Sequence, residues 1–89
     1  MNAQQRELFR LALLRVLESN PTERGLGLQA LQLSVGAFGF SMPGLDALKA
    51  ELAYLEDKRF AVVVGKAISP ENKTWRITAD GRDELASNG

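Results

Sequence analysis

The hydrophobic residues of the first twenty positions recur at helical spacing. Between Ala3 and Ser19, apolar side chains return every three or four residues and form a stripe wider than one packing face requires. The members of the stripe are Leu8, Phe9, Leu11, Leu13, Leu14, Val16 and Leu17. Pro21 ends this helix, because the residue before a proline avoids the helical region. The width of the stripe indicates either that the core covers two sides of the helix or that a partner covers one.

A short extended segment and a second helix are predicted before residue 40. Residues 25–28, with the sequence Gly-Leu-Gly-Leu, follow a loop and suit a short extended segment. The helix is expected from Gln29 to Phe38, with Leu31 and Val35 on its apolar side. Gly36 and Gly39 leave its end open, since glycine commonly follows the last turn of a helix.

The third helix has the clearest pattern in the chain. It is predicted from Ser41 to Lys58, with Ser41 as the N-cap and Pro43 in the first turn. One face carries the leucines at positions 45, 48, 52 and 55, and we expect it to face the core. The opposite face presents Asp46, Ala47, Ala50, Ala53, Tyr54 and Asp57.

A β-hairpin and a short helix are predicted after residue 59. The β-branched run within Phe60–Val64 favours a strand, and a turn is expected over 69–73. The second strand is Thr74–Ile77, in which alternation places Trp75 on the same side as Ile77. Thr78 can cap a short final helix.

This order of elements predicts an α+β fold of the winged helix-turn-helix class. It comprises three helices, a two-stranded β wing and a short C-terminal helix, in a single domain over residues 1–89. A hydrophobic content of 45% is sufficient for one core. We expect that core to contain Leu13, Leu17, Leu31, Leu48, Leu52, Leu55 and Trp75.

Composition narrows the classes of function. The chain has neither cysteine nor histidine, so it lacks a thiol nucleophile and the usual general base, and an enzyme is the least expected class. No cofactor or metal site is predicted. No apolar run approaches the roughly 20 residues of a membrane span, and the start of the chain is unlike a secretory signal. We therefore expect a cytoplasmic protein that does not enter a membrane.

Charge is distributed unevenly, although the eleven basic and eleven acidic residues cancel. Pro43–Asp57 contains one lysine against four acidic residues, whereas Lys58–Arg76 contains five basic residues against one acid. DNA would repel the first segment, but basic side chains of a hairpin can contact phosphates. The candidate DNA contacts are Lys66, Lys73, Arg76, Lys49 and Tyr54. Basic residues on a hairpin also protect an edge strand from pairing, so that interpretation stays open.

Several segments resemble one known family. They are residues 28–31 and 36–41, the run Leu48–Lys58 ahead of the hairpin, and the run Trp75–Asp83 at its end, and their order is more specific than any one alone. Together they are similar to a family of small winged-helix proteins of Mu-like phages and prophages, often labelled regulators of the arsenical-repressor type. The resemblance covers nearly the whole chain and implies a phage origin and DNA binding. It implies no defined set of functional residues.

Two hypotheses follow. The first is a transcriptional regulator that binds double-stranded DNA as a homodimer, with Leu8, Leu11 and Leu14 in the dimer interface. The second is an interaction module for a phage protein in assembly or DNA packaging, without direct reading of DNA. A continuous positive strip through the wing would favour the DNA-binding regulator. An apolar patch surrounded by acidic residues would favour the protein-interaction module. The arginines of the first helix, at positions 6, 10 and 15, are expected to be ordinary surface charges.

Overall fold

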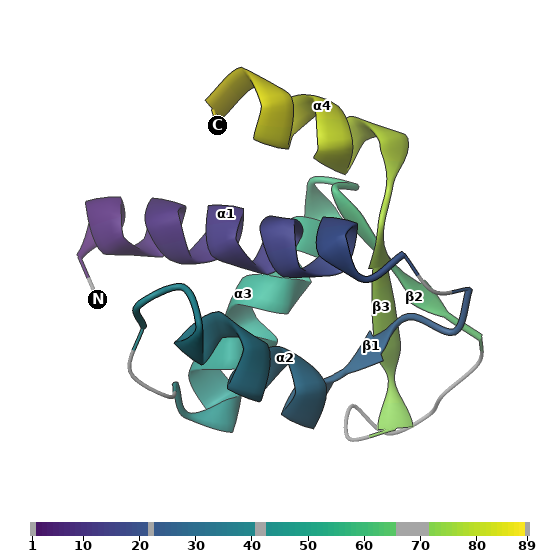
Figure 1. The fold of residues 1–89 in the computed structure, drawn as a ribbon, viewed down its shortest axis with the longest axis horizontal. Helices are drawn as coiled ribbons and strands as arrows, with labels where there is room; N and C mark the ends of the chain where they lie inside the picture. The colour runs from purple at the N-terminus through teal and green to yellow at the C-terminus, as the bar shows by residue number, and fades with distance from the viewer. Residues whose placement is uncertain (1, 22, 41–42, 66–71, 89) are drawn as a thin grey trace.

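The structure, a computed structural model, describes residues 2–21, 23–40, 43–65 and 72–88. Within these residues, helices and strands alternate in an α+β arrangement, as the sequence predicts (Figure 1). Their order is α1 (Ala3–Ser19), β1 (Leu26–Gly27), α2 (Leu28–Gly36), α3 (Leu45–Asp57), β2 (Ala61–Val64), β3 (Thr74–Ile77) and α4 (Ala79–Asn88). The first helix and the second hairpin strand have the predicted bounds.

The three strands form one antiparallel sheet in the order β1-β3-β2. The predicted extended segment at 25–28 contains β1, which pairs with β3 through Leu26 and Trp75. The chain enters β1 at Gly25, whose φ is +73°, and a Cβ at this position would lie 2.6 Å from the Trp75 carbonyl oxygen. Because glycine has no Cβ, Gly25 allows β1 to approach β3 of the hairpin.

The starts of α1 and α3 differ in how they are capped. Asn2 caps α1, where its side-chain oxygen accepts the backbone N–H of Gln5 at 2.8 Å. The Gln5 side chain accepts the N–H of Asn2 in return, which completes a capping box. In contrast, α3 begins at Leu45 after Gly44, without a side-chain cap.

The predicted start of α3 is therefore wrong. Pro43 precedes the helix, and its carbonyl accepts a hydrogen bond from the Gln32 side chain at 2.7 Å. The predicted N-cap, Ser41, lies outside the described residues. Leu45, expected in the core, is 39% exposed because it stands at the end of the helix.

The core forms where α1 meets α2, α3 and the inner face of the sheet. All seven residues predicted for the core are buried, and Phe9, Leu14, Val35 and Ile77 are buried with them. The sheet contributes Trp75 from its inner face, and the Trp75 indole N–H donates to a carboxylate oxygen of Glu56 at 3.1 Å. Trp75 is thus a core residue with its one polar atom satisfied.

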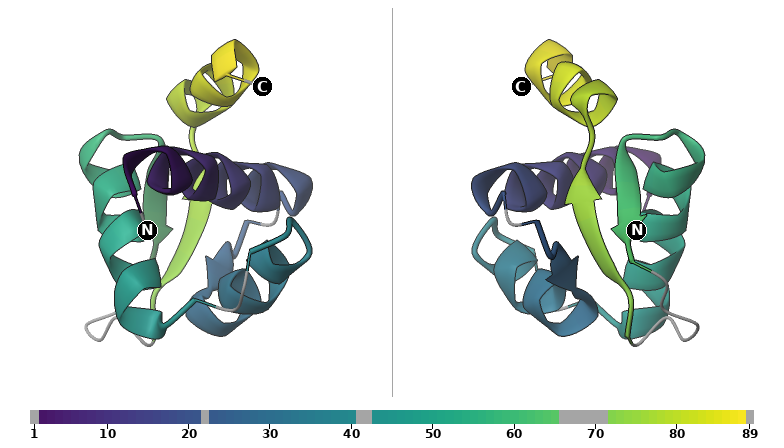
Figure 2. Two further views of the ribbon diagram at one scale, coloured as in Figure 1. Left: turned by 90° about the vertical axis from the view of Figure 1, so that its left-hand side faces the viewer. Right: turned by 90° about the vertical axis from the view of Figure 1, so that its right-hand side faces the viewer.

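The last helix lies on the side of α1 opposite α2 and α3 (Figure 2). Thr78 caps α4 as predicted, since its hydroxyl oxygen accepts the N–H of Gly81 at 3.0 Å. The same hydroxyl donates to the carbonyl of Arg59 at 2.6 Å. Gly81 lies against the Phe60 carbonyl with no room for a Cβ, so glycine at this position allows α4 to approach the segment between α3 and β2.

Candidate functional site

The first candidate surface is the hairpin end, which is the end of the molecule where β2 ends and β3 begins. This end of β2 and β3 and the N-terminal end of α3 lie on the same side of the molecule (Figure 1). Lys73 directly precedes β3 at this end and is half-buried. Lys66, the other predicted contact of the hairpin, lies outside the described residues.

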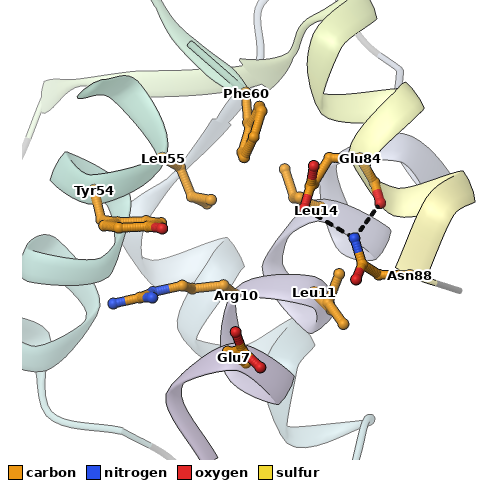
Figure 3. Close-up of a pocket in the computed structure, with 9 residues that line it drawn as sticks. All are labelled: Glu7, Arg10, Leu11, Leu14, Tyr54, Leu55, Phe60, Glu84 and Asn88. Atoms are coloured by element: carbon orange, nitrogen blue, oxygen red, sulfur yellow. Dashed lines mark hydrogen bonds between the residues drawn. The ribbon is translucent and has the colours of Figure 1, made fainter. Parts of the chain in front are cut away.

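Lys49 and Tyr54, the two predicted DNA contacts on α3, lie on different flanks of that helix. Lys49 is seven residues before Glu56, so both side chains lie on the flank that faces Trp75 of the sheet. Tyr54 lies on the flank that faces α1, where the Arg10 guanidinium carbon is 3.6 Å from the centre of its ring (Figure 3). The structure thus places Lys49 on the side of the hairpin and turns Tyr54 away from it.

Arg10 is not the ordinary surface charge that the sequence suggested. Its Nε and Nη2 donate to the two carboxylate oxygens of Glu51 at 3.1 and 3.2 Å. Glu51 is only 7% exposed, and this paired contact together with the stacking on Tyr54 joins α1 to α3. The sequence did contain a signal, because Glu51 lies between Leu48 and Leu55 on the apolar side of the helix.

These contacts change the charge that α3 presents. Of the four acids counted over Pro43–Asp57, Glu51 is buried against Arg10, and Glu56 is half-buried and accepts a hydrogen bond from Trp75. Asp46 and Asp57 stay exposed. The helix therefore exposes fewer acids than the count over Pro43–Asp57 suggested, and the two that stay exposed are the two predicted for its outward face.

Arg76 lies elsewhere, on the outer face of the sheet. It is exposed and stands opposite Val62 in the pairing of β2 with β3. A shallow hollow there brings Arg76 together with Arg82 of α4 and with Glu23 from the loop after α1. The structure therefore separates Arg76 from the hairpin end and groups it with an arginine that the sequence analysis had not singled out.

A second candidate surface is the side of α1 turned away from α3. Leu8 is 52% exposed and Leu11 is half-buried, and both line a hollow with Phe38 and Phe40 from the segment after α2. Leu14 was predicted to share this interface, but it is 1% exposed and belongs to the core, so that prediction is wrong. The sequence analysis missed Phe38 and Phe40 because they follow the last turn of α2, outside its apolar periodicity.

A third space lies between α1, α3 and α4 (Figure 3). It measures about 90 Å³ and has apolar walls from Leu11, Leu14, Leu55 and Phe60. Glu7, Arg10, Tyr54, Glu84 and Asn88 provide the polar part of the lining. Sites for cofactors and drug-sized ligands commonly measure about 300–1,000 Å³, so this space is too small for such a molecule.

The described part of the chain holds no group of carboxylates arranged to bind a metal ion. None of its helices combines the length and the apolar character that crossing a bilayer requires. Comparison of the chain with protein-family models, with curated proteins and with solved structures finds no match.

Proposed function

We propose that the protein is a winged-helix regulator that binds double-stranded DNA with its hairpin end. The observation that supports this most is the sheet order β1-β3-β2 behind a helical pair, α2 and α3. This is the connectivity of a winged helix, in which the second helix of the pair is offered to the major groove beside the hairpin. The shared end of α3 and the hairpin in Figure 1 suits such docking.

Charge supports contact with phosphates more than reading of bases. Lys73 and Lys49 stand on the hairpin side, and the pairing of Glu51 with Arg10 neutralises one of the four acids of α3. The outward face of α3 carries alanines with Asp46 and Asp57, which cannot form the paired hydrogen bonds that arginine or asparagine makes with base edges. Binding is therefore expected to be weak, dependent on salt and tolerant of sequence.

A titration with fluorescently labelled duplex at low salt tests this proposal. The double variant Lys66→Glu with Lys73→Glu should lose most binding, because it reverses the charge of Lys73 at the hairpin end and that of Lys66, the second basic residue between β2 and β3 in the sequence. The matched control, Arg76→Glu with Arg82→Glu, makes the same change of charge on the outer face of the sheet and should retain most affinity. Asp46→Asn with Asp57→Asn should bind more tightly than the wild type, since a repulsion is removed.

Two outcomes contradict the proposal. One is unchanged anisotropy for the wild type at high protein concentration, with circular dichroism showing an intact fold. The other is an equal loss of affinity in the hairpin variant and in its sheet-face control, which would indicate a nonspecific effect of net charge. The slope of log affinity against log salt should fall by about 0.9 for each phosphate contact removed.

A second function is favoured by exposed apolar side chains. Leu33 on α2 is 65% exposed, and Phe38 lies in the hollow beside Leu8. DNA phosphates do not bind such side chains, whereas interfaces between proteins commonly contain them. The alternative is therefore a winged-helix interaction module that serves phage assembly or DNA packaging. Absence of duplex binding, together with loss of a protein complex in Leu33→Ser, would favour it.

A further inference from the structure

The outer face of the β2–β3 hairpin is not covered by any of the described helices. In the right-hand view of Figure 2 the two strands face the viewer, and the helices lie behind or above them. Because Trp75 packs in the core, alternation along β3 turns Arg76 to this outer side. Val62 stands opposite Arg76 in the strand pairing and is 42% exposed. This face therefore combines an exposed apolar side chain with a positive charge.

A hollow of about 390 Å³ lies on this face, between the sheet, the start of α4 and the loop after α1. Leu17 and Ile77, both buried, are part of its lining. Val62 and Pro21 add exposed apolar surface. Unlike the space between α1, α3 and α4, this hollow is within the size range of common ligand sites, roughly 300–1,000 Å³.

Two arginines line the hollow, and neither forms an ion pair among the described residues. Arg76 comes from β3, the central strand, and Arg82 from the first turn of α4. Ala79, three residues before Arg82, also lines the hollow, so this side of α4 is turned toward it. Glu23 is the acid of this lining, but no ion pair joins it to either arginine. The hollow thus holds two positive charges against one negative charge.

The junction of β3 and α4 positions the two arginines relative to one another. The Thr78 backbone N–H donates to the Phe60 carbonyl at 3.1 Å, which continues the pairing of the strands. The Thr78 hydroxyl accepts the N–H of Gly81 at 3.0 Å, which starts the helix. Arg76 and Arg82 stand on either side of this junction, so the backbone that carries them is fixed before a ligand arrives. Such preorganisation lowers the cost of binding.

We propose that this hollow binds an extended acidic segment of a partner protein. Arginine forms two parallel hydrogen bonds with a carboxylate, so Arg76 and Arg82 are suited to acidic side chains. An apolar side chain of the same segment covers Val62 and Pro21. Side chains two positions apart share a face of an extended chain. The expected motif is therefore an acidic residue and an apolar residue separated by one position.

The composition of the hollow favours a peptide over a nucleic acid. A duplex presents a dense row of phosphates, which Glu23 would repel and which leave Val62 and Pro21 without an apolar partner. A peptide can place one carboxylate at the arginines and keep other charges away from Glu23. The hollow is also separate from the hairpin end and from Leu33 and Phe38. The inference therefore does not rest on the proposed binding of DNA.

Fluorescence anisotropy with a labelled peptide tests this proposal. The probe is eight residues long, with serine at every second position and with glutamate and valine alternating between the serines. It should bind the wild type with a dissociation constant of about a millimolar or lower. A matched peptide with glutamine in place of glutamate should bind at least about tenfold more weakly, because the charge-assisted hydrogen bonds are lost.

Variants of the protein locate the binding. Arg76→Glu with Arg82→Glu should weaken it at least about tenfold, because both positive charges of the hollow are reversed. The matched control, Arg6→Glu with Arg15→Glu, makes the same change of net charge at exposed positions of α1 and should retain most affinity. Val62→Ser should weaken binding of the valine peptide about threefold, since apolar contact is lost. Circular dichroism checks that each variant is folded.

Four outcomes would overturn the inference. The first is no saturable binding of the glutamate peptide to the wild type up to about a millimolar. The second is an equal loss of affinity in the two double variants, which would indicate a general effect of net charge. The third is equal binding of the glutamate and glutamine peptides. The fourth is displacement of the peptide by an equal concentration of inorganic phosphate, which would indicate a site for small anions.

Discussion

Arg10 and Arg15 are five residues apart on α1 and carry the same charge, but the two flanks of the helix give them different surroundings. Arg10 faces α3, where Glu51 accepts both of its hydrogen bonds and Tyr54 lies against its guanidinium. Arg15 faces the hollow beside Leu8 and Phe38 and is exposed. On one flank the chain supplies the partner itself. On the other flank the same kind of side chain is exposed.

The comparison teaches that the width of an apolar stripe does not say what covers it. The stripe of α1 was wide enough for two sides of core or for core and partner. Leu14 turned out to be covered within the chain, whereas Leu8 was left exposed. Most of the stripe is therefore used for folding, and Leu8 is its one exposed member.

The largest expected effect is the difference in stability between variants of Arg10 and of Arg15. Arg10→Ala leaves Glu51 buried and unpaired, and it should lower the free energy of unfolding by about 3–5 kcal/mol. Arg15→Ala should change it by no more than about 0.5 kcal/mol, as is usual for exposed positions. Urea unfolding followed by circular dichroism measures both. Arg10→Met with Glu51→Leu should recover much of the loss, because no unpaired charge is left; failure to recover would show that burial of a lone carboxylate is not the cause.

A second contrast uses two leucines of similar size on different surfaces. Leu52→Ala creates a cavity in a small core and should cost about 2–5 kcal/mol. Leu8→Ala should cost less than about 0.5 kcal/mol in the single chain but weaken self-association. Thermal unfolding at low protein concentration, combined with sedimentation, distinguishes the two effects. Equal destabilisation by both substitutions would mean that Leu8 is covered within the single chain.

The smallest effect concerns Tyr54, which the sequence suggested as a groove contact. Tyr54→Leu keeps an apolar side chain but removes the ring under Arg10, so it should cost about 0.5–1 kcal/mol of stability. Because Tyr54 is turned toward α1, affinity for duplex should not change. A clear loss of affinity with only a minor loss of stability would show instead that the ring contacts DNA, as first predicted. The paired measurements are urea unfolding and the duplex titration.

Much of the fold was predictable from local patterns. The bounds of α1 and β3 follow from periodicity and from the break at Pro21, and the cap at Thr78 follows from its place ahead of acidic residues. The buried leucines of α3 at positions 48, 52 and 55 follow from helical spacing. Leu45 did not follow this pattern, because the end of a helix can extend beyond its neighbours even when its spacing fits.

The candidate surfaces were less predictable. Lys73 was identified by its charge and its place beside the second strand, and the structure puts it at the hairpin end. Arg76 was assigned to the same group, but alternation in β3 directs it to the outer face of the sheet, beside Arg82. Phe38 had no periodic neighbours and became recognisable only next to Leu8. Spacing gives the direction of a side chain within its own element but not its neighbours from other elements.

The sequence by itself determined which segments form helices and strands and most of their apolar faces, because those properties depend on residues within a few positions of one another. The tertiary structure alone decided that Arg10 reaches Glu51, which is 41 residues away, and that Trp75 reaches Glu56 across the junction of α3 and the sheet. It also decided that Gly25 brings β1 against β3. Such contacts depend on the mutual orientation of whole elements, which is set by how the core fills its space and is not encoded in any one segment.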